Sequence, residues 1–467
     1  MGMLRNRYNR TDLFALVPQF GLRFEPQLEL LDRLLDDDEL FERVRADLAR
    51  RDPQTGSRGR PSTPVEVILR MLVVMRLYGW SYEQTEYFVN DSLVLRQFCR
   101  VYLEKVPDDT VLIRWANTIG PETVQALNDR VVQLARSLKV TRGRKLRVDT
   151  TAVETNIHFP TDSGLLGDGV RVVSRLLRRA RAVLGEAASD LGEAFRSRVR
   201  TVRRIAQQLH RLARRKGEQG RGAMKAAYGR LIATVKRTAA QGRRVLEAIR
   251  ERADEKAGRL GERLAEILPR LKPGIRQAER RVLEDDPVPA DEKVLSLFEP
   301  HTQVVPRFKA GKSVEFGRKI RLDEVEGGII TGYAVLEQAG GQDQPYLADA
   351  LANHKDQFGR APALLAADRG LASAANERLA REAGVKQVAL PHVGKPPPGR
   401  AAEERGRRFK RGYRFRAGIE GRIHALRRDY DLKRCRYHGE RGMGRWVGWG
   451  ILAHNLSKVA EAGAARG

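Results

Sequence analysis

Hydrophobic residues recur at helical spacing over the first third of the chain. The segment STPVEVILRMLVVMRLYG, residues 62–79, starts with a Ser/Thr cap followed by a proline and ends at a glycine. Its apolar stripe is formed by Val65, Ile68, Leu69, Leu72 and Val73. Further short helical segments start at Ser81 and Asp91 and near Asp109 and Glu122. The pattern therefore predicts an all-helical region over residues 25–140.

Two of these helices lie on either side of Gly79, and this spacing fits a helix-turn-helix. Such helix pairs bind DNA in many proteins, but they also occur as purely structural packing. The sequence alone leaves both interpretations open. We expect a helical N-terminal domain over residues 1–140 that contains this candidate DNA-binding motif.

Alternating patterns typical of strands appear elsewhere in the chain. The stretch KLRVDTTAVETNI, which falls within residues 145–158, is rich in Val and Thr and predicts a strand. From residue 292 onwards the pattern predicts a hairpin, then alternating helices and strands, a mobile Gly/Pro-rich basic loop and a final helical region. These are the hairpin 313–338, helix 344–359, strand 362–370, helix 373–384, strand 385–391, loop 392–408 and helices 411–461. If the first strand joins them, the sheet has five strands with flanking helices.

Residues 171–290 interrupt this sheet with another helical pattern. Arginines stand between apolar residues at helical spacing, and the segment holds 31 Lys+Arg against 14 Asp+Glu. Its net charge of +17 is the larger part of the +28 of the whole chain. We expect a basic α-helical insertion and favour contact with phosphates over a solvated coiled-coil arm. The apolar positions are Val173, Leu176, Leu177, Ala180, Val199, Val202, Ile205, Leu209 and Leu212.

The net charge of the whole chain indicates which class of molecule it binds. The 467 residues include 87 Lys+Arg and 59 Asp+Glu, and the isoelectric point is about 10.6. This excess points to a polyanion, most simply nucleic acid, with a membrane surface as the competing polyanion. No apolar run approaches the roughly 18 residues of a transmembrane helix. The only two cysteines, Cys99 and Cys435, exclude a Cys-rich zinc finger and suggest reduced thiols in a cytoplasmic protein.

Three acidic residues stand at positions where an acid needs an explanation. Asp149 interrupts the predicted strand 145–158, where an ionised carboxylate costs several kcal/mol without a cation or good hydrogen bonds. Asp368 ends the strand LLAAD, where ligand-binding side chains of α/β sheets gather, although an acid there is also a common turn cap. Glu420 shares a helix face with Tyr413, Arg416 and Arg427, at spacings of 3, 4 and 7.

Together these motifs resemble the bacterial insertion-sequence transposases, which have an RNase H-like catalytic domain and an Asp-Asp-Glu triad. The segment GRPSTPVEVILRMLVVMRLYGWSYEQTE is similar to their N-terminal helical domain. RVDTTAVETNI resembles their first strand, KSVEFGRKIRL the second and AADRG the fourth. YRFRAGIEGRIHALRRDYDL resembles their Glu-bearing helix and its Tyr-x2-Arg-x3-Glu-x6-Lys pattern, with Arg427 in place of the lysine. The long basic insertion is less general in that family.

The resemblance implies a fold, an activity and a site. The fold is α/β, with an RNase H-like mixed five-stranded sheet over residues 141–170 and 291–461. An all-α domain (1–140) precedes it, the basic insertion (171–290) interrupts it and a tail (462–467) follows. The activity is metal-dependent cleavage at transposon ends and strand transfer into target DNA by a homodimer or higher oligomer. Asp149, Asp368 and Glu420 would be the catalytic residues and would hold two Mg²⁺ or Mn²⁺ ions. The expected DNA contacts are Tyr413, Arg416, Arg427, Lys312, Arg318, Lys319, Lys433 and Arg434.

Several alternatives stay open at the level of the sequence. Glu154, Asp162 or Glu315 could replace one of the three acids as a metal ligand, and His424 could pair with Glu420. An RNase H-like endonuclease without strand transfer would need the same three acids. A domesticated DNA-binding protein would be expected to have lost one of them. A coiled-coil protein that condenses nucleic acid would explain residues 171–290 but leave the acids without a role.

Overall fold

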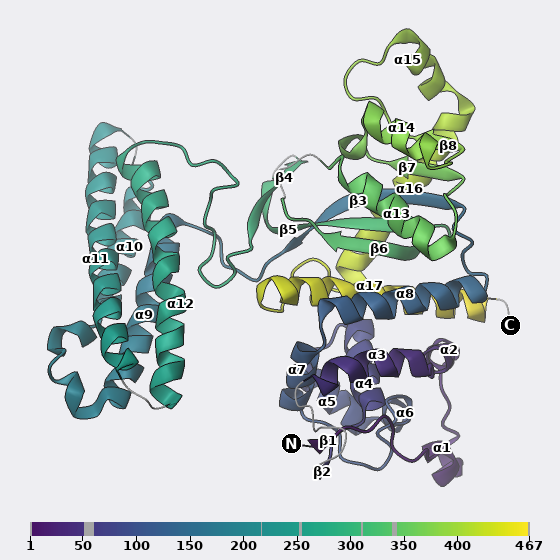
Figure 1. Cartoon of the computed structure of the whole chain (residues 1–467), viewed down its shortest axis with the longest axis horizontal. Helices are drawn as coiled ribbons and strands as arrows, with labels where there is room; N and C mark the ends of the chain where they lie inside the picture. The colour runs from purple at the N-terminus through teal and green to yellow at the C-terminus, as the bar shows by residue number, and fades with distance from the viewer. Residues whose placement is uncertain are drawn as a thin grey trace. The chain divides into compact units, whose positions relative to one another are not determined.

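The computed structural model describes residues 2–50, 60–215, 217–251, 255–309, 312–338 and 343–465. The chain forms two compact units (Figure 1). Unit 1 comprises Met1–Thr155 and Arg318–Gly467, and unit 2 comprises Asn156–Gly317. No helix in the described part of the chain is both long enough and apolar enough to cross a lipid bilayer.

The first half of unit 1 is helical, as the hydrophobic pattern predicts. The predicted helix over residues 62–79 is α4, whose stop at Gly79 is a left-handed C-cap with φ of 68°. Ser81 caps the next helix, α5, through a capping box with Gln84. After the short α1, Leu13–Leu16, the helices are α2 Pro26–Leu34, α3 Asp38–Ala49, α4 Val65–Tyr78, α5 Tyr82–Asp91, α6 Leu93–Phe98, α7 Asp109–Thr118 and α8 Pro121–Ser137.

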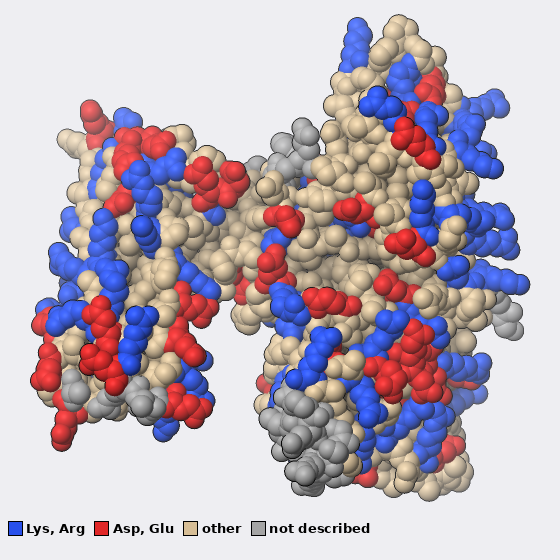
Figure 2. Space-filling model, in the orientation of Figure 1, with Lys and Arg blue, Asp and Glu red and all other residues tan. Residues whose placement is uncertain are grey.

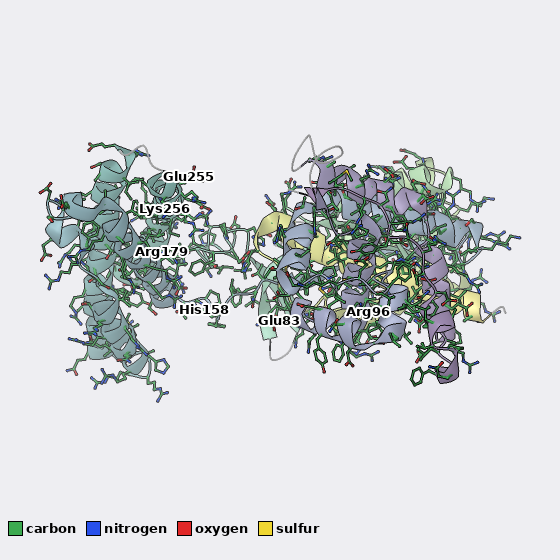
Figure 3. All side chains as sticks on the ribbon, turned by 90° about the horizontal axis from the view of Figure 1, so that it is seen from below. Glu83, Arg96, His158, Arg179, Glu255 and Lys256 are labelled. Atoms are coloured by element: carbon green, nitrogen blue, oxygen red, sulfur yellow. The ribbon has the colours of Figure 1, made fainter. Side chains whose placement is uncertain are left out.

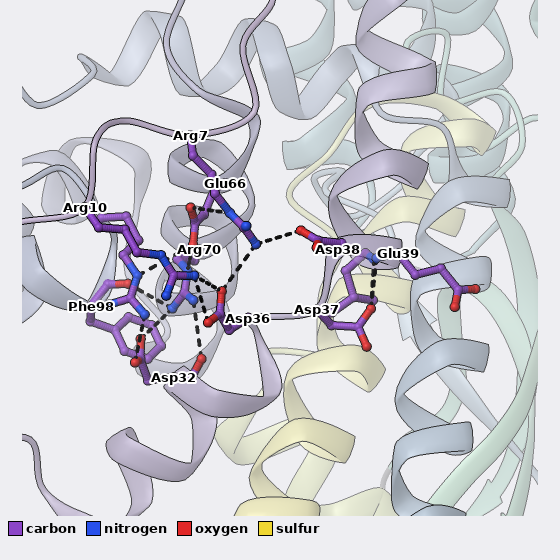
Figure 4. A network of polar contacts seen from close by, with 12 residues as sticks. Arg7, Arg10, Asp32, Asp36, Asp37, Asp38, Glu39, Glu66, Arg70 and Phe98 are labelled. Carbon is purple, nitrogen blue, oxygen red and sulfur yellow. Dashed lines mark hydrogen bonds and ion pairs between the residues drawn. The ribbon is translucent and has the colours of Figure 1, made fainter.

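A buried arginine ties these helices together (Figure 4). Arg70 lies in the middle of α4 with its side chain fully buried. Its guanidinium pairs with Asp32 of α2 at 2.7 Å and with Glu66 at 3.1 Å, and it donates to the carbonyl of Phe98 at 3.0 Å. Losing one of these carboxylates would leave a buried charge poorly compensated, a defect that costs about 3–5 kcal/mol.

The last helix of the chain completes the core of the first helices. α17, Gly439–Ala464, packs against α2, α4 and α8 in unit 1. Its residues Trp449, Leu452, Leu456 and Val459 are buried in the same hydrophobic cluster as the residues of α4. The helices of residues 1–140 therefore belong to the same compact unit as β3, β6, β7, β8 and the part of β5 from Arg318 onwards.

The sheet has six strands among the described residues, one more than the five predicted. The missed strand is β4, whose sequence QVVPRFK contains Pro306 and so lacks a clear strand pattern. β3 ends at Glu154, four residues before the predicted end at 158. The order is β4-β5-β3-β7-β8, with β6 paired to β5. The strands are β3 Lys145–Glu154, β4 Gln303–Lys309, β5 Lys312–Val325, β6 Ile329–Val335, β7 Leu364–Ala367 and β8 Gln387–Ala389.

The sheet is mixed. β3, β7 and β8 run parallel to one another, and β4, β5 and β6 pair antiparallel. The predicted hairpin is β5–β6. The loop expected over residues 392–408 is instead largely helical, because Pro398 starts a helix at its first position, where a proline costs nothing. The helices of this half are α13 Tyr346–Phe358, α14 Ala374–Glu382, α15 Pro398–Arg405 and α16 Arg407–Asp429.

Unit 2 contains the helical insertion. Its four long helices bury two apolar clusters, one formed mainly by α9, α11 and α12 and the other by α9, α10 and α11. All nine apolar positions predicted from the helical spacing lie in or against these clusters. The helices are α9 Asp162–Leu184, α10 Val199–Leu212, α11 Glu218–Arg250 and α12 Glu255–Ala278.

Candidate active site

Asp149, in the middle of β3, lies beside Asp368, the residue directly after the neighbouring strand β7. β3 and β7 run parallel, and their register pairs Val148 with Ala367. The two aspartates are the next residues on each strand, about 5 Å apart at the backbone if the strand spacing continues. Asp149 is 6% exposed. Asp368 also accepts a hydrogen bond from the backbone N–H of Arg369 at 2.7 Å, so it caps the following turn as well.

Helix α16 lies against β3, β7 and β8 and places Arg416 opposite these two acids. Arg416 Nη2 lies 3.1 Å from Asp149 Oδ2 and 3.4 Å from Asp368 Oδ1. Arg416 Nη1 donates to Glu420 Oε1 at 2.8 Å, one turn further along the helix. The three acids predicted as a set therefore converge on one guanidinium, which is the cation that Asp149 needs.

The charges around Arg416 do not balance, because three carboxylates face one guanidinium. Burial raises the pKa of Asp149 to about 6, against the opposing effects of Arg416 and of the Thr150 backbone N–H. Burial alone would lower the pKa of Arg416, but the charges of Asp149 and Asp368 outweigh it and raise that pKa. The site thus holds spare negative charge, and water screens it poorly at the buried Asp149, whereas the side chain of Asp368 is half-buried and that of Glu420 is exposed.

These residues suit a hard divalent cation by their chemistry. Carboxylate oxygens are the ligands that Mg²⁺ and Mn²⁺ prefer, and the spare negative charge favours a doubly charged ion. Among the described residues, no three His, Cys, Asp or Glu side chains stand as a ready-made metal cluster. At this site Arg416 contacts all three carboxylates, and it would have to move for a metal to replace it.

A second group of buried charges, which the sequence analysis missed, fixes α16 on the sheet. Arg147, two residues before Asp149 and on the same face of β3, pairs with the fully buried Glu324 of β5 at 2.6 Å. Arg147 Nη1 also donates to the backbone carbonyl of Phe415 at 2.6 Å. Arg422 of α16 reaches the same Glu324 at 3.1 Å. We call Arg147, Glu324 and Arg422 the helix clamp, because they hold α16 on both sides of Glu420.

Two glycines allow this close approach. A Cβ at Gly418 would lie 2.3 Å from Arg147 Nη1, and a Cβ at Gly412 would lie 2.8 Å from the Cβ of Ala389 on β8. Real side chains do not approach that closely, so a larger residue at Gly412 would push α16 away from β8, and one at Gly418 would displace the Arg147 guanidinium from its contacts. A search of the sequence for charged residues would not find these two glycines. Glycines on the inner face of a helix nevertheless indicate close packing.

Comparisons with known proteins find two transposase domains in the chain. Residues 22–118 match the family model of a transposase domain, DUF772, and residues 290–456 match that of the transposase DDE domain. The second match includes Asp368 and Glu420, and Asp149 lies outside both. No curated protein and no solved structure matches the chain. The chain belongs to the insertion-sequence DDE transposases. Transposition, a reaction on DNA, is therefore the function that its domains indicate.

Near the candidate site of this transposase, on β5, a lysine forms a further ion pair with an acid. Lys319 Nζ lies 2.5 Å and 2.6 Å from the two carboxylate oxygens of Asp343. Asp343 in turn accepts from the hydroxyl of Thr150, the neighbour of Asp149, at 3.3 Å. Lys319, a predicted DNA contact, is therefore neutralised by Asp343, and the two lie beside Thr150, whose side chain points to the opposite face of β3 from Asp149.

The other residues predicted to contact DNA differ in their exposure and in their partners. Tyr413 is 36% exposed and stacks on Phe409, and Arg427 is half-buried. Lys433 is exposed, and Arg434 pairs with Glu154 at 3.1 Å. Arg318 is only 3% exposed and donates to the carbonyl of Leu336, so the transposase does not present it to a ligand here. Lys312 begins β5, and its side chain lies outside what the structure describes.

The first turns of α16 carry positive charge, which destabilises the N-terminus of a helix. Its first turn has no acid, whereas a helix N-terminus favours negative charge. Lys and Arg project from the edge of unit 1 beside α15 and α16 (Figure 2). The exposed basic residues at the start of α16 are Arg407, Arg408, Lys410, Arg411 and Arg414. An anionic ligand such as DNA phosphate would relieve this repulsion.

The candidate helix-turn-helix, formed by α4 and α5, differs from the start of α16 in its charge. α4 is buried from Val65 to Arg76, and α5 contains no Lys or Arg. The exposed side of α5 carries Glu83 (Figure 3), Tyr87 and Asp91. Such a helix would meet DNA phosphates with negative charge, so the structure gives no support to a recognition role for α5.

The alternative metal ligands have other partners. Glu154 pairs with Arg434, and Asp162 binds Gln277 at 2.6 Å and Arg281 at 2.9 Å within unit 2. Glu315 is 5% exposed on the part of β5 that belongs to unit 2. His424 is exposed on α16. Asp162 thus has a structural role in unit 2, joining α9 to α12.

Proposed function

We propose that this transposase cleaves DNA at the ends of its element and joins those ends to target DNA, with Asp149, Asp368 and Glu420 as the catalytic residues. The observation that carries the proposal is the convergence of the three acids on Arg416 from two parallel strands and one helix. Three carboxylates and one guanidinium form a site that attracts both divalent cations and, through the arginine, a phosphate.

The three acids would hold Mg²⁺ or Mn²⁺, two ions in all, which supply an activated water or 3′-hydroxyl and stabilise the leaving oxygen. Arg416 would bind the phosphate next to the scissile bond with its two-pronged guanidinium, after leaving the carboxylates. The basic start of α16 would hold neighbouring phosphates and fix the register of the DNA without reading bases. The buried Asp149 would accept the metal only once deprotonated, so its raised pKa couples metal binding to pH.

The test uses a labelled duplex that carries one end of the element, incubated with the full-length protein in Mg²⁺ and, separately, in Ca²⁺. We expect the wild type to cleave in Mg²⁺ and to join a pre-cut 3′-hydroxyl end to a second duplex. Asp149→Asn should bind the duplex in Ca²⁺ as the wild type does and lose cleavage by several orders of magnitude. Cleavage without joining would favour an endonuclease, and equal activity of the two proteins would refute the site.

A further inference from the structure

Charge is distributed unevenly over the helices of unit 2. From residue 196 to residue 216 the sequence contains nine Lys or Arg and no Asp or Glu. Helix α10, Val199–Leu212, is the centre of this stretch. Over residues 255–286, which include α12, eight Lys or Arg stand beside seven Asp or Glu. α10 packs on α9 and α11, and α12 packs on the same two helices. Residues 196–216 therefore carry more net positive charge than any other stretch of the same length in unit 2, although α9 and α11 also carry exposed arginines.

The arginines of α12 and α10 differ in their partners. On α12, Arg259, Arg270 and Arg276 each pair with a carboxylate of unit 2. Figure 2 shows red and blue side chains intermixed on the side of unit 2 that carries α11 and α12. Arg179 of α9 and Lys256 of α12, labelled in Figure 3, line one groove together with Glu262 and Glu266. The surface at α12 is thus of mixed charge.

The exposed arginines of α10, unlike the three paired arginines of α12, lack acidic partners among the described residues. Six exposed arginines in or directly after this helix form no ion pair with any carboxylate of the described residues. Three of them, at positions separated by four and seven residues, share the face opposite the buried stripe of Val202, Ile205, Leu209 and Leu212. The six are Arg200, Arg203, Arg204, Arg211, Arg214 and Arg215. Mutual repulsion of these charges destabilises the helix, because like charges at such spacings repel.

We infer that the exposed face of α10 is a docking surface for the phosphate backbone of duplex DNA, a role that rests on the proposed function. Arg200 and Arg211 are eleven residues apart, or about 17 Å along the helix axis. That length matches about five phosphate steps of one DNA strand. Guanidinium groups bind phosphates in a two-pronged manner, and neutralising phosphates releases counterions. Because no base-reading geometry is required, this contact holds DNA of any sequence.

The test compares two triple variants of the full-length protein with the same loss of charge. In the first, Arg200, Arg204 and Arg211 on α10 are each replaced by Gln. In the control, the paired Arg259, Arg270 and Arg276 on α12 are each replaced by Gln. Affinity for an end-containing duplex and for an unrelated duplex is measured in Ca²⁺ from about 50 to 200 mM salt, a range in which phosphate contacts dominate the salt dependence.

We expect the α10 variant to reduce the slope of log affinity against log salt by about 2–3 for both duplexes, at about 0.9 per phosphate contact. The α12 variant should leave the slope near that of the wild type. Equal slopes for all three proteins, or equal losses in both variants, would overturn the inference. An Arg→Lys triple at the three α10 positions keeps the charge and should restore the slope, which excludes misfolding as the cause. Because binding in Ca²⁺ needs no cleavage, failure of the catalytic proposal would show separately in Mg²⁺.

Discussion

The guanidinium of Arg147 donates a 2.6 Å hydrogen bond to the backbone carbonyl of Phe415, the residue before Arg416. Through this bond, a strand residue two positions from Asp149 fixes the rotation of the helix that carries Glu420. Arg422 repeats the attachment two residues beyond Glu420, through the same Glu324. The helix clamp therefore positions the helix that carries one of the three acids proposed as catalytic, and its three residues are not themselves among those acids.

The first prediction concerns two glycines of α16 that differ only in what faces them. Gly418→Ala places a methyl group against Arg147 and should destabilise the protein by about 1–3 kcal/mol, a typical cost of overpacking. Gly421→Ala meets nothing within 4 Å and should stabilise the helix by about 0.5–1 kcal/mol. Urea unfolding of both variants measures this difference. Equal stabilisation by both alanines would contradict the close approach.

The second prediction removes the centre of the helix clamp. Glu324→Gln leaves Arg147 and Arg422 without their buried anion and should cost about 3–5 kcal/mol. The control is Glu122→Gln, which breaks an exposed pair with Arg441 and should cost at most about 1 kcal/mol. If Glu324 positions Glu420, the variant should also bind Mn²⁺ more weakly, as measured by electron paramagnetic resonance. A loss of stability with unchanged Mn²⁺ affinity would make the clamp merely structural.

The third prediction follows from the pKa of Asp149. Its folded value of about 6 lies above the ordinary 3.8, so between these values the folded state holds the proton more tightly than the unfolded state. Stability in the absence of metal therefore falls as pH rises through this window, by up to about 3 kcal/mol. Asp149→Asn should remove that fall, making the variant more stable than the wild type at pH 8 but not at pH 3.5. Thermal melts in EDTA across this range test the sign, and a wild type that gains stability relative to the variant as pH rises would refute it.

The fourth prediction distinguishes a residue of α16 that binds DNA from a residue on the same face that is needed for cleavage. Arg416→Lys keeps the charge but loses the planar contact, so DNA binding should weaken modestly and the position of cleavage should become less exact. Glu420→Gln should leave binding intact and abolish cleavage, because a metal ligand is lost. Both variants are measured on the same end-containing duplex in Mg²⁺ and Ca²⁺. Normal cutting by Glu420→Gln together with an inert Arg416→Lys would reverse the assigned roles.

The sequence predicted most of the elements because their patterns are strong. The apolar stripe of α4 with its Gly79 stop, the β5–β6 hairpin and the helices of unit 2 each follow a single period over many residues. β4 and α15 were missed because their segments contain prolines, which local patterns associate with loops. In both cases the proline sits where the fold tolerates it, at an edge strand or at a helix start.

The three acids of the candidate site could be predicted from the sequence, but the residues that hold their helix in place could not. Asp149, Asp368 and Glu420 stand out because an acid in or beside an apolar strand, or among arginines, breaks the local pattern. Arg147 and Glu324 do not stand out, since charged residues in a strand with alternating polarity look exposed. Only the packing of α16 over β3 and β5 turns them into buried partners. Residues that act through long-range contacts leave no trace in a local window.

The position of α17 in the core has a consequence for how the protein is made. The helices α2, α4 and α8 bury their apolar faces against a partner that is synthesised roughly 300 residues after α8 ends. At a translation rate of about 5–20 residues per second, this delay is about 15–60 s. During that time the nascent helices expose apolar surface, which favours chaperone capture or aggregation. Each transposase molecule therefore completes its native core only when synthesis has passed Ala460, the last buried residue of α17.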